Sequence, residues 1–187
     1  MSTKKTPAQY VAFLRGINVG GNVLISMADL KKAFVSLGFT NITTILVSGN
    51  VVFEAAETNR AVLTKTIEQG LERAFGFQIA VTVRGGDEIQ ALLASKPFEK
   101  TKVTPQTKLH VTFLPANLKQ GIKVAESLKG PDYESCRISK GEVCSSVEIS
   151  LNRGTTELMK VLEVQFGKKI TTRTWKTVER IGKVLQS

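Results

Sequence analysis

The sequence predicts an α+β protein made of two ferredoxin-like (βαββαβ) halves that are packed through their sheets. The order strand, helix, strand, strand, helix, strand occurs twice along the 187 residues, and this order is that of the split βαβ unit. In addition, Val11–Leu14 is apolar at every position, so both faces of that strand should be buried. A lone unit leaves one sheet face open, and the second half is expected to cover it. The repeated order implies a duplication, without a clear residue-level repeat.

The first half is predicted to span residues 1–96. After a strand at Gln9–Arg15, a helix starts at Ser26, with Asp29 three residues on as a capping box. The apolar residues of this helix recur at helical spacing, and Gly38 ends it. The following elements are the hairpin strands Ile42–Val47 and Val51–Glu54, a helix at Asn59–Phe75 with Val62 among its inward residues, a strand at Gln78–Arg84 and an extra helix at Glu88–Ser95.

The second half is predicted to span residues 108–187, after a polar linker at residues 97–107 that contains two prolines. It repeats the pattern of the first half. Its predicted elements are a strand at Lys108–Leu114, a helix from Pro115 to about Leu128, hairpin strands at Tyr133–Ser139 and Val143–Leu151, a helix at Thr155–Phe166 with Val164 inward, a short strand at Lys169–Thr171 and a terminal helix at Arg173–Leu185.

Composition and charge narrow the class of protein. Hydrophobic residues make up 42% of the chain and charged residues 22%, as in ordinary soluble domains. No apolar run approaches the roughly 20 residues of a membrane helix, and the polar start does not read as a signal peptide, so a cytoplasmic location and no membrane partner are expected. The net charge is +10, and residues 96–187 carry seventeen Lys and Arg against nine Asp and Glu. This bias favours an anionic partner such as nucleic acid, although scattered lysines also fit a solvated surface.

The cysteines and the single histidine indicate no metal site. Cys136 and Cys144 flank a predicted hairpin turn. With a two-residue loop, residue 136 opposes residue 145, so that Cys136 faces inward and Cys144 lies on the other face. His110 is expected on the strand face opposite to that of Val111, as a structural residue. We therefore expect no disulfide, no metal and no cofactor.

Two polar loops carry the functional signal. A glycine-rich loop, Arg15–Gly21, follows the first strand, and a turn at Ser48–Asn50 joins two apolar strands. In a split βαβ unit the first and third strands are antiparallel neighbours, so the end of one lies beside the start of the other. The residues expected to converge are Arg15, Asn18, Gly20, Gly21, Ser48, Gly49 and Asn50.

These residues suit the binding of an anion. They offer a guanidinium, two amides, a hydroxyl and backbone N–H groups, which are good partners for a phosphate or carboxylate. They include no carboxylate, histidine or lysine to act as a general base, so no catalytic residue is assigned and enzymatic activity stays open. The predicted function is binding of a small anionic or nucleotide-like ligand. The alternative is a scaffold, in which the glycines supply positive φ and Gly49-Asn50 is ordinary hairpin chemistry.

Three segments, Tyr10–Gly21, Val47–Phe53 and Thr171–Val178, resemble those of an uncharacterised bacterial family, the domain of unknown function 1697 family. The resemblance runs through nearly the whole chain. It implies an α+β protein with ferredoxin-like halves and supplies no reaction. It directs attention to Arg15, Asn18, Ser48, Asn50, Arg173 and Trp175. Thr174 stands where the family pattern has Asn, which puts a polar role at that position in doubt.

The C-terminal tail has two interpretations. In one, Thr172 caps the last helix, with Arg173 in its first turn and Trp175 in the core. In the other, Arg173 joins the anion site and Trp175 forms a stacking wall.

Two rival functions come from other classes. A nucleic-acid-binding module is favoured by the charge, and RNA-recognition domains share the βαββαβ order, but they display aromatic side chains on an open sheet face. This chain has few aromatic residues, and its central strands are expected to be covered on both faces. A protein-interaction adaptor would need an exposed apolar stripe, which the sequence does not show, and no feature indicates an oligomeric state.

Overall fold

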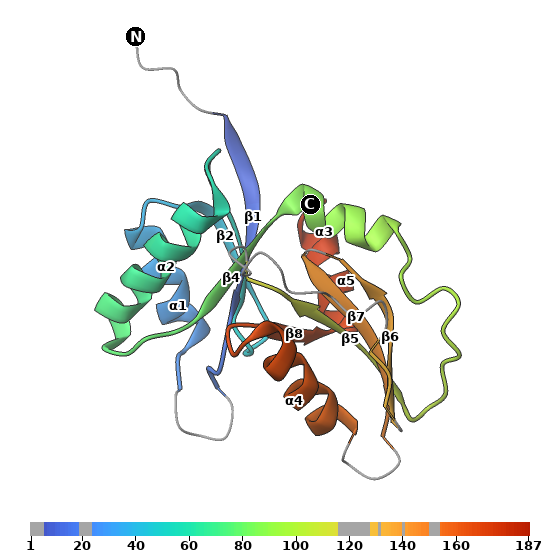
Figure 1. The fold of residues 1–187 in the computed structure, drawn as a ribbon. Helices are drawn as coiled ribbons and strands as arrows, with labels where there is room; N and C mark the ends of the chain where they lie inside the picture. The colour runs from blue at the N-terminus through green and yellow to red at the C-terminus, as the bar shows by residue number, and fades with distance from the viewer. Residues whose placement is uncertain (1–5, 19–23, 116–127, 131, 140, 150–153) are drawn as a thin grey trace. The chain divides into compact units, whose positions relative to one another are not determined.

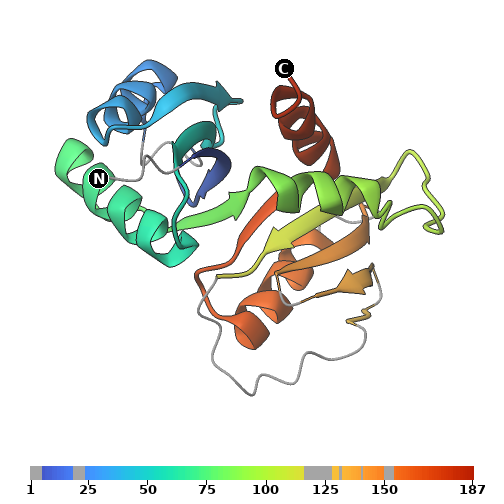
Figure 2. The same cartoon turned by 90° about the horizontal axis from the view of Figure 1, so that it is seen from above.

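The computed structural model describes residues 6–18, 24–115, 128–130, 132–139, 141–149 and 154–187. The chain divides into two compact units, Met1–Ala91 with Arg180–Ser187, and Leu92–Glu179. It has a mixed α+β fold with two antiparallel sheets and, over the described ranges, five helices, as Figure 1 and Figure 2 show.

The sheet of the first unit has four strands in the order β2-β3-β1-β4. The strands are β1 (Pro7–Leu14), β2 (Thr40–Ile45), β3 (Asn50–Ala56) and β4 (Val81–Gly85). The central strand β1 pairs antiparallel with β3 and β4, with Val11 opposite Val52 and Arg84. Val11, Ala12 and Phe13 have no exposed surface. Both faces of β1 are therefore buried, as its continuous apolar run predicts.

Two helices cover one face of this sheet. Helix α1 (Met27–Ser36) begins after Ser26, whose Oγ accepts a hydrogen bond from the Asp29 N–H over 3.0 Å, as predicted. Helix α2 (Arg60–Phe75) ends at Gly76 in the left-handed conformation. The prediction that Val62 points inward is wrong, since this residue is 56% exposed. The buried face of α2 runs through Leu63, Ile67 and Leu71, one position further along the helix.

Two more helices contribute to the first unit. Helix α3 (Gly86–Ala94) directly follows β4, and α5 (Trp175–Val184) ends near the C-terminus. The Gln90 side chain of α3 donates a hydrogen bond to the Gly182 carbonyl of α5 over 2.9 Å. The last residues of the chain are thereby joined to the unit formed by its first residues.

The sheet of the second unit has the order β6-β7-β5-β8. The strands are β5 (Thr107–Phe113), β6 (Tyr133–Ile138), β7 (Glu142–Glu148) and β8 (Thr171–Thr174). Helix α4 (Gly154–Phe166) packs on one face through Leu158, Leu162 and Phe166. The prediction of an inward Val164 is wrong, because this residue is 88% exposed. The helix predicted from Pro115 falls at residues 116–127, outside the described residues.

The hairpin of the second unit departs from the predicted register. Arg137 pairs with Cys144, as a two-residue loop predicts, but Ser135 and not residue 136 pairs with Ser145. One extra residue on β6 thus forms a β-bulge, which shifts the pairing of every residue before it. Cys144 is a buried free thiol.

The C-terminal tail also differs from the prediction. Thr172 and Arg173 lie in β8, where Arg173 pairs with Val111, and not at the start of the last helix. Consecutive threonines favour an extended strand. Pairing with β5 stabilises that strand over the predicted start of a helix. Helix α5 begins at Trp175. The Thr177 N–H donates to Thr174 Oγ1 over 3.4 Å, so the capping contact comes from Thr174 instead of Thr172.

Candidate functional site

The two polar loops of the first unit meet, as predicted. The Leu14 N–H at the end of β1 donates to the Gly49 carbonyl over 2.8 Å. The Asn18 Nδ2 donates to the Val47 carbonyl over 2.7 Å. The antiparallel pairing of β1 and β3 therefore brings together residues that are about thirty positions apart in the sequence.

The side chain of Asn18 holds this arrangement together. Besides its bond to Val47, its Nδ2 donates to the Ile25 carbonyl over 3.0 Å, and its Oδ1 accepts from the Ile25 N–H over 2.8 Å. One amide thus joins both ends of the glycine-rich loop to the facing turn. Gly20 and Gly21 lie between these ends, outside the described residues.

Asn50 plays a similar part on the facing strand. It is fully buried, and its Nδ2 donates to the Ile45 carbonyl over 2.8 Å and to Ser48 Oγ over 3.1 Å. A buried amide needs such partners. Both predicted amide ligands are therefore engaged with the protein itself, which supports a positioning role for Asn18 and Asn50.

The backbone of the two loops adopts the left-handed conformation at four positions. The φ angles are +72° at Gly16, +56° at Asn18, +59° at Leu46 and +75° at Gly49. A Cβ atom at Gly49 would lie 2.8 Å from both Leu14 Cβ and Ile17 Cδ1, so this position needs glycine. Leu46 is the unusual member, because leucine rarely occupies this region.

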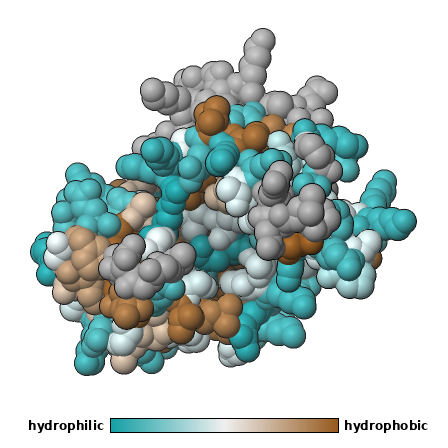
Figure 3. Space-filling view, turned by 90° about the horizontal axis from the view of Figure 1, so that it is seen from below, coloured by the Kyte–Doolittle hydropathy of each residue, from teal (hydrophilic) through white to brown (hydrophobic). Residues whose placement is uncertain are grey.

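The outer surface of the loops combines polar and apolar groups. Arg15 and Ser48 are half-exposed, whereas Leu24 is 81% and Val47 67% exposed. On the face of the molecule drawn in Figure 3, apolar side chains form several small groups among hydrophilic ones. In and around the two loops, a partly exposed cationic residue thus occurs together with exposed aliphatic side chains.

The two predicted residues of the tail belong to the second unit. Arg173 Nη1 donates to the Thr172 carbonyl over 2.9 Å, and burial lowers the pKa of Arg173 to about 10, so it is charged at neutral pH. Trp175 is half-buried and packs edge-on against Phe98, with ring centroids 5.1 Å apart. This packing supports the structural interpretation of Trp175.

Two buried polar residues lie on neighbouring strands of the same unit. His110 and Ser145 are directly opposite each other on β5 and β7. His110 Nε2 and Ser145 Oγ have no hydrogen-bond partner among the described residues. Burial, with a smaller contribution from Lys108, lowers the pKa of His110 below 6.5. The imidazole is therefore neutral at pH 7.

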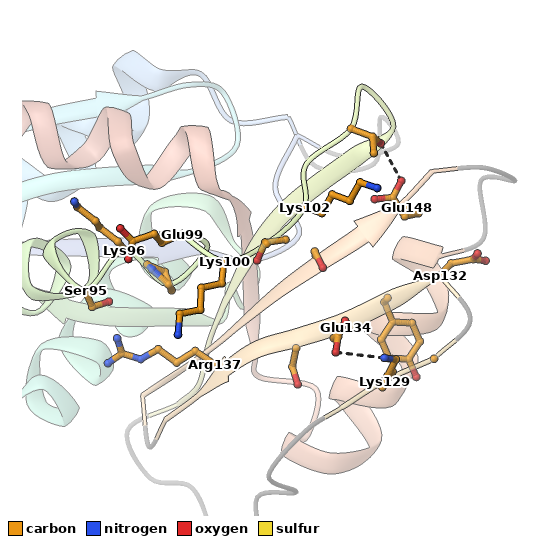
Figure 4. A pocket seen from close by; sticks show the side chains of 17 residues that line it. Ser95, Lys96, Glu99, Lys100, Lys102, Lys129, Asp132, Glu134, Arg137 and Glu148 are labelled. Atoms are coloured by element: carbon orange, nitrogen blue, oxygen red, sulfur yellow. Dashed lines mark hydrogen bonds and ion pairs between the residues drawn. The ribbon is translucent and has the colours of Figure 1, made fainter.

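Sequence reasoning missed a groove in the second unit, which Figure 4 shows. It has a volume of about 1010 Å³. One wall is the segment Ser95–Thr104, most of which falls in the predicted linker at residues 97–107, and the floor includes residues of β6 and β7. The lysines of that segment are the sequence signal that points to the groove, but only the fold places them and Arg137 in the lining of the same groove.

Metal-binding clusters and membrane spans are both missing from the described part of the chain. Over those ranges, no group of three His, Cys, Asp or Glu side chains is placed to hold a metal ion. None of the described helices has the length and apolar character needed to cross a membrane.

The fold defines an α+β protein with two four-stranded antiparallel sheets. The chain belongs to the family described as "Protein of unknown function (DUF1697)", which it matches over residues 8–144. It is similar in structure to a conserved bacterial protein from Streptococcus pneumoniae, with a TM-score of 0.74 and 24% identity, over 96% of this chain and 99% of that one. No curated protein matches the chain. The likeness to the streptococcal protein supports the fold alone.

Proposed function

We propose that the protein binds a small anionic or nucleotide-like ligand at the two loops of the first unit, with Arg15 as the residue that contacts the anion. The observation that carries this proposal is the cluster of four left-handed residues where the loops meet. The strain lies at Leu46 and Asn18, because glycine adopts this conformation freely; such strain persists only where its surroundings enforce it, and it is concentrated at ligand sites.

The side-chain contacts supply that enforcement. Asn18 forms hydrogen bonds with Ile25, beyond the glycine-rich loop, and with the facing turn. Asn50 donates a hydrogen bond across that turn to the Ile45 carbonyl. A leucine in the left-handed region costs roughly 1–2 kcal/mol, which a simple connection between strands does not require. In this proposal Asn18, Asn50 and Gly49 position the loops.

Ligand contact is assigned to the outer groups. The Arg15 guanidinium can form a forked, charge-assisted contact with a phosphate or carboxylate. Ser48 adds a half-exposed hydroxyl, and the predicted donors Gly20 and Gly21 lie outside the described residues. Arg173 and Trp175 are assigned to packing within the second unit.

We also infer that each unit is ferredoxin-like and that the two arose by duplication. Equivalent strand orders support this inference, and so do equivalent contacts. Leu14 N–H bonds Gly49 O and Leu114 N–H bonds Gly141 O, both over 2.8 Å. Arg84 and Arg173 each donate from Nη1 to the preceding carbonyl over 2.9 Å. The packing of the halves through their sheets stays a prediction.

The test of the ligand proposal is a thermal-shift screen with nucleotides, sugar phosphates and RNA, at low and at physiological salt. A charge-assisted contact contributes roughly 1.5–3 kcal/mol, so Arg15→Ala should weaken binding of any hit about tenfold to a hundredfold. Arg15→Lys should recover only part of the affinity, because an ammonium cannot make the forked contact. Arg73→Ala is the matched control, since it removes an exposed arginine of the same unit.

The unliganded melting temperature separates the two interpretations of Arg15. If Arg15 serves a ligand, the Arg15→Ala variant should melt close to the wild type and lose the ligand-induced shift. A variant that melts much lower and keeps the full shift would assign Arg15 to the scaffold. That result would end the proposal.

A further inference from the structure

We propose that the groove of the second unit is a separate anion site, in which Lys100 and Arg137 bind a phosphate ester. The site lies within Leu92–Glu179, so it does not depend on the function proposed for the loops around Arg15. Three features of the groove carry this inference: its floor, its wall and the distribution of its charges.

The floor is shaped by the β-bulge in β6. Residues directly opposite each other on antiparallel strands share a face of the sheet. Arg137 pairs with Cys144, and Glu134 pairs with Ser146. Regular alternation would put Glu134 and Arg137, three residues apart, on opposite faces. The extra residue between them brings both side chains to the groove, and bulges re-aim side chains in this way beside functional sites.

The wall that carries Lys96 and Lys100 is an ordered segment with one buried residue, Phe98. Two turns order it, with the Glu99 N–H bonded to the Lys96 carbonyl and the Thr101 N–H bonded to the Phe98 carbonyl, each over 3.0 Å. Phe98 between the two lysines is buried and packs on Trp175. The lysines are therefore carried on an anchored backbone, and Trp175 acts as a positioning residue for this wall.

The charges divide the groove into two ends. Figure 4 shows Lys100 and Arg137 reaching toward the end near Ser95, whereas Asp132 and Lys129 lie at the far end. Lys100 and Arg137 form no hydrogen bond or ion pair with a side chain that the structure describes. At the far end, by contrast, Glu134 accepts from Lys129 over 3.5 Å.

The remaining acidic groups leave the cationic end uncompensated. Glu148 accepts hydrogen bonds from the hydroxyls of Thr104, over 3.2 Å, and Thr107. Glu99 is the carboxylate nearest in sequence to Lys100, and Figure 4 shows the charged ends of Lys100 and Arg137 directed to the same end of the groove. Like charges that converge on a concave surface repel each other, and an anion between them removes that repulsion.

The residue types favour phosphate among anions. Arginine matches the geometry of phosphate oxygens with a fork of donors, and lysine adds a mobile point charge. The volume of about 1010 Å³ is at the upper end of small-ligand pockets and also accommodates part of a nucleic-acid strand. Small phosphate esters and nucleic acids share the phosphate ester group, and a comparison of probes of both kinds distinguishes between them.

The test compares two double variants of the full chain, each also made in an Arg15→Ala background so that the loop site cannot contribute. Lys100→Ala/Arg137→Ala removes the groove cations. Lys108→Ala/Lys160→Ala removes two exposed lysines of the same unit that do not line the groove, with the same change in charge. The probes are inorganic pyrophosphate and ATP by calorimetry, and a fluorescein-labelled oligouridylate of about ten nucleotides by anisotropy.

Each probe that binds the wild type should bind the groove variant at least about tenfold more weakly. The affinity of the control variant should differ from that of the wild type by less than about twofold. For the oligouridylate, the slope of log affinity against log salt should fall by about 1.4, which is about 0.7 for each phosphate of a single strand that the variant no longer neutralises. Tighter binding of ATP than of the oligouridylate would identify a small phosphate ester. The reverse order would identify single-stranded nucleic acid, and both outcomes support the site.

The proposal fails if none of the three probes binds the wild type, or if the two double variants weaken binding equally, because the effect is then one of net charge alone. All four substituted side chains are exposed, so both variants should melt like the wild type. Arg137→Lys gives an independent check. It should lose part of the affinity while retaining the charge, and full affinity in this variant would exclude a forked phosphate contact.

Discussion

Gly49 and Gly16 allow a direct measurement of how tightly the two loops of the first unit are packed. Both are glycines with nearly the same backbone angle, φ +75° and +72°. A Cβ atom at Gly49 would lie 2.8 Å from Leu14 Cβ and from Ile17 Cδ1, whereas a Cβ atom at Gly16 would meet nothing within 4 Å. Gly49→Ala and Gly16→Ala therefore share the conformational cost and differ only in the steric one.

The magnitudes follow from these distances. The left-handed conformation costs an L-residue roughly 1–2 kcal/mol, which is the whole expected effect of Gly16→Ala. At Gly49 the Ile17 methyl group can rotate away, but Leu14 Cβ is attached to the backbone of β1, which bonds to Gly49 itself. Overpacking of this kind adds roughly 1–3 kcal/mol. Gly49→Ala should therefore cost about 2–5 kcal/mol.

The assay is urea unfolding followed by far-ultraviolet circular dichroism, with both variants and the wild type measured together. Far-ultraviolet circular dichroism is preferred to fluorescence because the single tryptophan, Trp175, lies outside the first unit. Gly49→Ala should lower the midpoint clearly more than Gly16→Ala, at an unchanged slope m. Equal midpoints for the two variants would refute the reasoning, since the loops would then relax around the added methyl group.

Two further predictions concern a helix cap and a buried base. Ser26→Ala should lower the free energy of unfolding by about 1 kcal/mol, because it leaves the Asp29 N–H without its capping oxygen; an unchanged urea midpoint would contradict this. The pKa of His110 is lowered below 6.5 in the folded chain, so the unfolded chain binds more protons as the pH falls below 6.5. The stability linked to His110 should be fully present above pH 6.5 and lost as the pH falls through the pKa of the folded state. Urea midpoints measured from pH 7 to about pH 5 test this, and His110→Leu should remove this part of their pH dependence. An identical pH dependence in the variant and the wild type would show that other groups cause it.

Local signals in the sequence were sufficient for much of the first unit. Ser26 and Asp29 marked the start of α1, and Gly76 ended α2 in the left-handed conformation. These features depend on backbone groups within a few residues, so they can be read from neighbouring positions. The apolar run Val11–Leu14 indicated a strand buried on both faces. The order of elements was sufficient to predict that the glycine-rich loop lies beside the Ser48–Asn50 turn.

Tertiary structure decided what depends on distant partners. Val62 and Val164 have the spacing of core residues, but the packing of each helix on its sheet turned them to solvent. Arg173 lies in a strand because β5 offers a partner for it, and no local pattern reveals that pairing. The sequence predicted that the amides of Asn18 and Asn50 contact a ligand, whereas in the structure both donate to backbone carbonyls of the protein.

The groove of the second unit illustrates the same division. The sequence by itself determined its charge, since Lys96, Lys100 and Arg137 are cations in any fold. Their places in the lining of one groove were decided by the bulge in β6 and by the packing of Phe98 on Trp175. A bulge adds one residue to a ladder whose register depends on the pairing of two whole strands, and a packed ring needs a partner from far along the chain. Such choices are made by the assembled sheet and core, because only there do the competing pairings differ in free energy.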